Sequence, residues 1–190
     1  MSQERIRSFI AVDLDSPEIL DRIATAQKGM QQTRAQLKPV DTAIMHLTLR
    51  FLGEIPAPTV EMVKEAMRPI RFCPFEVEFS GLGVFPNLNR INVVWVGIRK
   101  GQDELMGIFH QLEPALRKLG LPPDDKGFNP HLTIARVRSN VNRAALADFV
   151  VSMREQNFGK MTAQVVRLKK STLTPQGPIY ATMHEVTASN

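Results

Sequence analysis

The sequence has little cysteine, few large aromatic residues and no long apolar run. Its 190 residues include one cysteine, one tryptophan and one tyrosine. The single cysteine, Cys73, excludes an internal disulfide and a cysteine-rich zinc site, and it fits a reducing compartment. No apolar stretch approaches the roughly 20 residues of a membrane helix, and no apolar leader follows the first charged residues, so we expect a cytoplasmic protein that does not span a membrane. Because Cys73 stands at the start of an expected strand, we expect it to be a small core residue.

A large excess of one charge is also missing. Lysine and arginine total 24 against 19 acidic residues, which gives a net charge of +5 without any long basic run. No run of lysine and arginine marks a basic tail. A modest positive field favours a partner that carries phosphate, although an ordinary solvated surface has the same balance. Hydrophobic residues at 43% and charged residues at 23% are typical of a globular domain.

What the sequence does contain is a repeated pattern. The motif His-x-Thr-x occurs as HLTL at 46–49 and as HLTI at 131–134, which places the two histidines 85 residues apart. Each motif belongs to a strand–helix–strand–helix–strand series. We therefore predict an α+β fold in which residues 1–190 form a single domain with two pseudo-symmetric lobes, about 6–80 and 91–170, and 171–190 add a closing strand.

Strand geometry predicts where the motif side chains point. Side chains alternate across a strand, so His46, Thr48 and Arg50 should share one face. His131 and Thr133 should likewise share a face of their own strand. If the lobes face each other across a pseudo-two-fold axis, both His–Thr pairs line one cleft.

Two histidines and two hydroxyl groups suit displacement at phosphorus. The unperturbed pKa of histidine is about 6.5, so near neutral pH one ring can be neutral and the other protonated. The neutral ring can take a proton from water and the protonated ring can give one to the leaving oxygen. Threonine hydroxyls can donate hydrogen bonds to the non-bridging oxygens. The residues alone do not assign the acid and the base.

A metal site is the main chemical alternative. Catalytic zinc usually has three protein ligands, and neither motif contains an acidic residue. The other histidines, His110 and His184, are each expected to be surface or satisfied residues. We therefore predict no metal and no cofactor.

Several segments resemble the 2H phosphoesterase superfamily, which is named for its two His-x-Thr/Ser-x motifs. These are SFIAVDL, HLTLRFLGE, GLGVFPN, VVWVGI, PHLTIAR and GPIY, and they extend from residue 8 to about residue 180. They look most similar to the bacterial and archaeal RNA 2′,3′-cyclic phosphodiesterases, historically called 2′-5′ RNA ligases. The resemblance implies two lobes, each an antiparallel sheet with two helices packed outside, and an active-site cleft between them. It also implies metal-independent hydrolysis of a 2′,3′-cyclic phosphate at an RNA end to a 2′-phosphomonoester, with weak 2′-5′ ligation as the reverse reaction.

The resemblance also implies roles for individual residues. His46 would be the proton donor, His131 the proton acceptor, and Thr48 and Thr133 would hold the phosphate. It suggests Arg136 as a further phosphate contact, but strict alternation puts Arg136 on the face opposite His131 unless the strand has a bulge. Strict alternation places Arg50 on the same face as His46, so Arg50 remains an alternative candidate for the phosphate contact.

Aromatic residues are candidates for holding the base of the substrate. Phe9 and Tyr180 could stack on it, although residues of this kind are more often core residues than base platforms, and we expect Trp95 to be a core residue.

Two alternative functions remain open from the sequence. The chain could be a non-catalytic RNA-end-binding protein, or it could act on the cyclic phosphate of a small nucleotide or an ADP-ribose derivative. We expect a monomer without an obligate protein partner, because one chain supplies both halves of the site.

Overall fold

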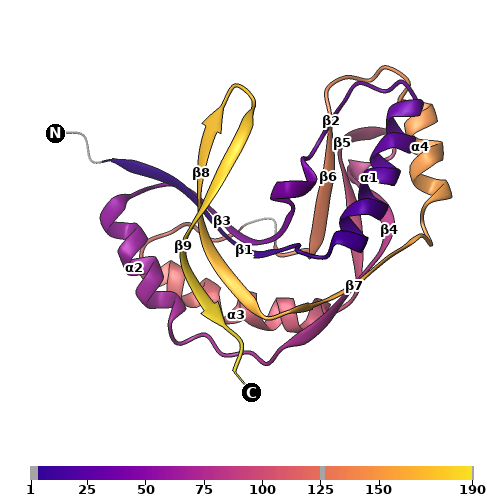
Figure 1. Cartoon of the computed structure of the whole chain (residues 1–190). Coiled ribbons are helices and arrows are strands. Elements are labelled where there is room, and N and C mark those ends of the chain that lie inside the picture. The colour runs from indigo at the N-terminus through magenta and orange to yellow at the C-terminus, as the bar shows by residue number, and fades with distance from the viewer. Residues whose placement is uncertain (1–3, 125–126, 190) are drawn as a thin grey trace.

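Two antiparallel sheets stand side by side in the computed structural model, which describes residues 4–124 and 127–189 (Figure 1). Sheet A has the strand order β3-β1-β8-β9 and sheet B has the order β2-β6-β5-β4-β7. The strands of sheet A are β1 (Arg5–Asp13), β3 (His46–Pro56), β8 (Val165–Thr174) and β9 (Gly177–Thr187). Those of sheet B are β2 (Leu37–Pro39), β4 (Phe75–Asn87), β5 (Arg90–Lys100), β6 (His131–Val137) and β7 (Asn157–Ala163).

Each sheet is covered on its outer face by a pair of helices. Helices α2 (Ala57–Met67) and α3 (Gln102–Lys118) lie against sheet A, and α1 (Pro17–Gln32) and α4 (Arg143–Ser152) lie against sheet B (Figure 1). The helices pack there through an apolar face. In α1, for example, the buried Ile19, Ile23 and Met30 recur at helical spacing and form one apolar stripe. The predicted two-lobed α+β class is therefore confirmed.

The lobes are not the two halves of the sequence. Strand β4 leaves the first half to join sheet B, and β8 leaves the second half to join sheet A. Helices α1 and α3 also cross to the opposite lobe (Figure 1). The expected lobes at 6–80 and 91–170 are therefore wrong as spatial units. The first helix and the last strand of each sequence half pack in the lobe formed mainly by the other half. Within 171–190, β9 closes sheet A by pairing with β8.

The core fills the space between each sheet and its helices. Phe79, Phe158 and Leu105 are among the largest fully buried side chains. Cys73 is exposed, so the prediction that it belongs to the core is wrong. It precedes the first residue of β4, Phe75, and therefore lies outside the regular sheet.

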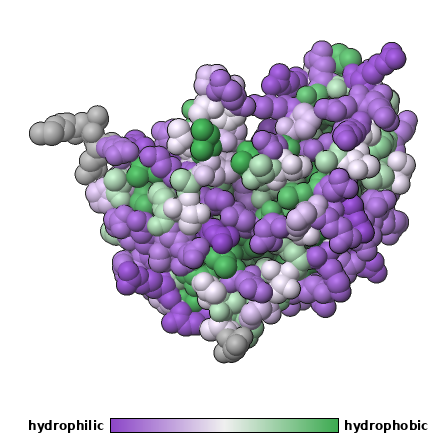
Figure 2. All heavy atoms as spheres, in the orientation of Figure 1, coloured by the Kyte–Doolittle hydropathy of each residue, from purple (hydrophilic) through white to green (hydrophobic). Residues whose placement is uncertain are grey.

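The surface is polar over most of the face seen in Figure 2, and it is hollowed between the projecting β8–β9 hairpin and the sheet B lobe. Among the described residues, no helix is long and apolar enough to cross a membrane.

Candidate active site

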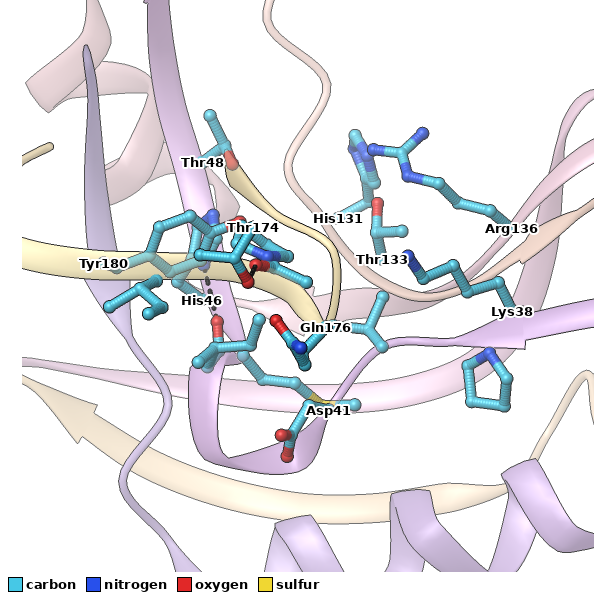
Figure 3. A pocket seen from close by; sticks show the side chains of 17 residues that line it. Lys38, Asp41, His46, Thr48, His131, Thr133, Arg136, Thr174, Gln176 and Tyr180 are labelled. Atoms are coloured by element: carbon cyan, nitrogen blue, oxygen red, sulfur yellow. Dashed lines mark hydrogen bonds between the residues drawn. The ribbon is translucent and has the colours of Figure 1, made fainter. Parts of the chain in front are cut away.

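A cavity of about 620 Å³ lies between the two sheets and collects both motifs (Figure 3). His46 and Thr48 enter it from β3, and His131 and Thr133 enter it from β6. Tyr180 joins from β9. The remaining polar lining comes from residues outside the motifs, namely Lys38, Asp41, Arg136, Thr174 and Gln176. The two lobes thus bring together side chains that are 85 residues apart in the sequence.

The two histidine rings are held in the same way. Nδ1 of His46 donates a hydrogen bond to the carbonyl oxygen of Ile44 at 2.9 Å, and Nδ1 of His131 donates to that of Asn129 at 2.7 Å. In both cases the acceptor lies two residues before the histidine. Because a carbonyl can only accept, each Nδ1 carries a hydrogen and each Nε2 is left for chemistry in the cavity. Neither Nε2 has a hydrogen-bond partner within the described part of the chain.

Aromatic rings support each histidine from behind. Phe9 stacks on His46 with ring centroids 4.6 Å apart, and Tyr180 meets the same imidazole edge-on at 5.2 Å. Phe85 meets His131 edge-on at 4.9 Å. Trp95 lies beside both Phe85 and His131. These contacts fix the orientation of both rings.

Burial gives His46 a distinct electrostatic environment. Loss of solvation lowers its pKa below 6.5, and the charge of Lys169 acts in the same direction. The hydrogen bond to Ile44 and the charge of Asp13 oppose this shift without cancelling it. In the protein without substrate, His46 is therefore biased toward the neutral imidazole.

Matching bulges decide which arginine reaches the cavity. In β3 the pairing with β1 skips Leu49, and in β6 the pairing with β5 skips Ile134, which is 85 residues later. Each bulge reverses the alternation that follows it. As a result Arg136 turns to the face of His131 and lines the cavity (Figure 3).

The bulge in β3 keeps Arg50 out of the cavity. The bulge turns Arg50 to the helix side, where its Nε donates a hydrogen bond to the Glu113 carboxylate at 2.9 Å. Its other nitrogens donate to the carbonyl oxygens of Phe51 and Pro122. Burial alone would raise the pKa of Glu113, but hydrogen bonds from Arg50 and Arg117 lower it overall. The expectation that Arg50 shares the face of His46 is therefore wrong, and Arg50 is part of a buried ion pair.

The two aromatic candidates occupy different positions. Phe9 is only 3% exposed and lies beneath the His46 ring rather than in the cavity wall. Tyr180 is half-buried and lines the cavity. Trp95 is half-buried on the cavity side of sheet B, where Gly83 makes room for its indole ring. A methyl group at position 83 would overlap that ring.

Sequence reasoning missed part of the cavity wall. Lys38 lies in the three-residue strand β2, which pairs with β6 so that Lys38 stands opposite Arg136. Gln176 lies in the turn between β8 and β9 and closes the cavity from the other lobe. Strand β2 is too short to show a period, and a turn pattern such as the one that contains Gln176 does not reveal which cavity the turn approaches.

Within residues 4–124 and 127–189, no group of three or more His, Cys, Asp or Glu side chains is placed to hold a metal ion. Asp41 is the one carboxylate among the described residues that line the cavity.

The fold and the cavity define a phosphoesterase of the two-histidine type, and sequence comparison agrees. The family described as LigT-like phosphoesterase matches residues 12–95 and 96–180, so that each match contains one His-x-Thr-x motif. The chain belongs to this family.

Individual relatives extend the comparison over nearly the whole chain. A protein of Aeropyrum pernix named RNA 2′,3′-cyclic phosphodiesterase is 37% identical over 172 residues, which are 90% of this chain and 98% of the relative. A Methanocaldococcus jannaschii protein of the same name is 35% identical over 95% of this chain and 99% of its own. Among solved structures, Escherichia coli LigT complexed with 3′-AMP aligns with a TM-score of 0.81 at 23% identity, covering 98% of this chain and 100% of that one. At this identity the structural match supports the fold alone.

Proposed function

We propose that the protein hydrolyses 2′,3′-cyclic phosphate ends of RNA to 2′-phosphomonoesters by acid–base catalysis between two histidines. The observation that carries the proposal is the pair of imidazoles, each tethered through Nδ1 and each presenting Nε2 in one cavity. The curated names of relatives 37% and 35% identical supply the substrate class.

The proposed reaction is an in-line displacement. Nε2 of His131 accepts a proton from water as the water oxygen attacks phosphorus. The bond from phosphorus to the 3′ oxygen breaks, and His46 donates its Nε2 proton to that oxygen. The products are a 2′-phosphomonoester and a 3′-hydroxyl, and solvent then restores the two protonation states. The assignment of donor and acceptor rests on resemblance to the family.

His46 must gain a proton for this role. Burial biases the free ring toward the neutral form. A phosphodiester anion bound beside it favours the imidazolium, because an opposite charge nearby raises the pKa of a histidine. The substrate would therefore help to charge its own acid.

The remaining polar groups hold the phosphate. Thr48 and Thr133 lie two residues after the histidines on the same strand faces, so their hydroxyls can donate to the non-bridging oxygens. Arg136 supplies a guanidinium from β6, and such a group forms strong hydrogen bonds with phosphate. Tyr180, which borders the His46 side of the cavity, is the better placed aromatic residue to contact the base or ribose.

The test is an assay of the purified protein in EDTA. The substrates are 2′,3′-cyclic AMP and a short RNA ending in a 2′,3′-cyclic phosphate, and the products are identified chromatographically. A 2′-phosphate product from both, with preference for RNA, is the expected result. Binding of RNA without turnover would instead identify an RNA-end-binding protein, and turnover restricted to a small nucleotide or an ADP-ribose cyclic phosphate would change the substrate. Ligation of a 5′-hydroxyl RNA is expected only as a minor reaction, because water is in vast excess.

A further inference from the structure

A second cavity, of about 410 Å³, lies where β5 begins and β6 ends. Its charged lining consists of Arg90, Arg138 and Arg143, and we call it the arginine cavity. The other lining residues include the polar Asn89, Asn92, Ser139 and Asn140, and none is acidic.

Among the described residues, the three arginines have no ion-pair partner, unlike basic residues such as Lys169 and Arg22. Lys169 pairs with Asp13 at 2.6 Å and Arg22 pairs with Glu18 at 2.6 Å. None of the guanidinium groups of the arginine cavity has an ion pair or a hydrogen bond within the described part of the chain. Like charges gathered without a counter-ion repel each other, and a bound anion removes that repulsion.

The arginine cavity continues the catalytic cavity along one strand. Arg136 and its cross-strand neighbour Lys38 line the catalytic cavity, and Arg138 follows two residues later, roughly 7 Å further along the chain. On the adjacent strand Val93 pairs with Arg136, and Asn92 beside it lines the arginine cavity. A series of basic groups thus leads from His131 to Arg138 over roughly 20 Å.

The composition of the arginine cavity points to backbone recognition. No aromatic residue lines it, so it offers no surface on which a base could stack. Guanidinium groups bind phosphate through paired hydrogen bonds, and such contacts carry no sequence information by themselves.

We propose that the arginine cavity binds phosphodiester groups of RNA nucleotides on the 5′ side of the cyclic phosphate, and so makes an RNA strand a better substrate than a mononucleotide. This inference rests on the proposed function. It assigns the arginines to positioning of the RNA chain and leaves the chemistry to the histidines.

The experiment compares a cavity variant with a charge-matched control. The cavity variant is Arg90→Gln/Arg138→Gln/Arg143→Gln. The control, Arg68→Gln/Arg99→Gln/Lys118→Gln, removes the same charge from exposed positions just after α2, on β5 and on α3. Each protein is assayed with 2′,3′-cyclic AMP and with a hexanucleotide ending in a 2′,3′-cyclic phosphate. Affinity for the same hexanucleotide with a 3′-phosphate is measured by fluorescence anisotropy at several salt concentrations.

The cavity variant is expected to lose about tenfold or more in kcat/KM and in affinity for the hexanucleotide, and to change less than twofold toward cyclic AMP. Its slope of log affinity against log salt should fall by about 2, since each phosphate contact on a single strand contributes about 0.7. Unchanged hexanucleotide affinity, an equal loss toward cyclic AMP, or an equal loss in the control would overturn the inference. If the parent protein turns over neither substrate, the proposed function fails, and the anisotropy measurement still decides whether the arginine cavity binds RNA.

Discussion

The two histidines of the cavity have the same backbone setting and different neighbours. Each begins a strand, each donates Nδ1 to a carbonyl oxygen two residues earlier, and each is followed three residues later by a bulge. The cross-strand partner of His46 is Asp13, which pairs with Lys169 and Arg167, whereas the partner of His131 is Gly97. The repeat therefore reproduces the geometry of the site without reproducing its electrostatics.

This difference allows one motif to serve two purposes. Acid–base catalysis by a pair of identical side chains requires that one be protonated while the other is neutral. Aromatic rings contact both histidines, whereas burial and the charges of Lys169 and Asp13 act on His46. The surroundings, rather than the motif, can thus divide the roles of the two imidazoles.

Removing either histidine should have the largest effect. His46→Ala and His131→Ala should each lower kcat/KM for 2′,3′-cyclic AMP by about 10²–10⁴-fold, which is the usual contribution of a general acid or base. His110→Ala, at an exposed position on α3, is the control and should keep normal activity. Full activity in either cavity variant would refute the mechanism.

Arg50 and Arg136, which follow the two motifs, should have different roles: the loss of Arg50 should lower stability, and the loss of Arg136 should lower activity. Arg50→Met leaves the Glu113 carboxylate buried without its main partner and should destabilise the protein by about 3–5 kcal/mol in denaturant unfolding. Arg117→Met removes the second arginine that pairs with Glu113; Arg117 is largely exposed, and its loss should cost about 1 kcal/mol or less. A stable Arg50→Met protein with impaired turnover would mean that Arg50 serves the site directly.

In contrast to Arg50, Arg136 should matter for activity and hardly for stability. Arg136→Gln should lower kcat/KM about 10–100-fold, because a hydrogen bond to a charged group contributes about 1.5–3 kcal/mol. Its stability should hardly change, since Arg136 is exposed and has no ion pair among the described residues. Arg154→Gln, at an exposed position just beyond α4, is the matched control. Unaltered kinetics in Arg136→Gln would remove Arg136 from the phosphate site.

A substitution at Gly83 tests whether the Trp95 ring, which contacts His131, positions that histidine. Gly83→Ala should displace the Trp95 indole and cost about 1–3 kcal/mol of stability. It should also lower turnover about tenfold, because small misplacements of a catalytic group are costly. Gly107→Ala, where the new methyl group meets no atom within 4 Å, should instead stabilise α3 slightly. Normal turnover in Gly83→Ala would show that the indole does not position His131.

The smallest effect should appear in a titration of His46 followed by NMR. Its pKa should lie below 6.5 in the free protein, because burial disfavours the imidazolium. The unfolded chain binds a proton just below pH 6.5 that the folded ring does not, so this residue makes stability fall as the pH drops through that range. Saturating inorganic phosphate should raise the pKa of His46. A free-protein pKa at or above 6.5 would contradict the account.

The sequence allowed a better prediction of the site residues than of how the strands and helices are distributed between the lobes. Alternation correctly placed Leu47 and Leu132 in the core and the His–Thr pairs on the opposite face, because the pattern is local. The same rule misplaced Arg50, since the bulges at Leu49 and Ile134 are set by pairing with β1 and β5. The exchange of β4 and β8 between lobes is likewise a tertiary property that no local spacing reveals. Lys38 was missed because β2 is too short to have a period.

The most direct test of the division between the two histidines uses a 2′,3′-cyclic substrate with sulfur in place of the 3′ oxygen. A thiolate leaves without protonation at neutral pH far more readily than an alkoxide does, so a missing acid matters little and a missing base matters fully. Turnover should recover in His46→Ala and remain low in His131→Ala. Recovery in His131→Ala, or equal rates in the two variants, would contradict the assignment of His46 as the acid and His131 as the base.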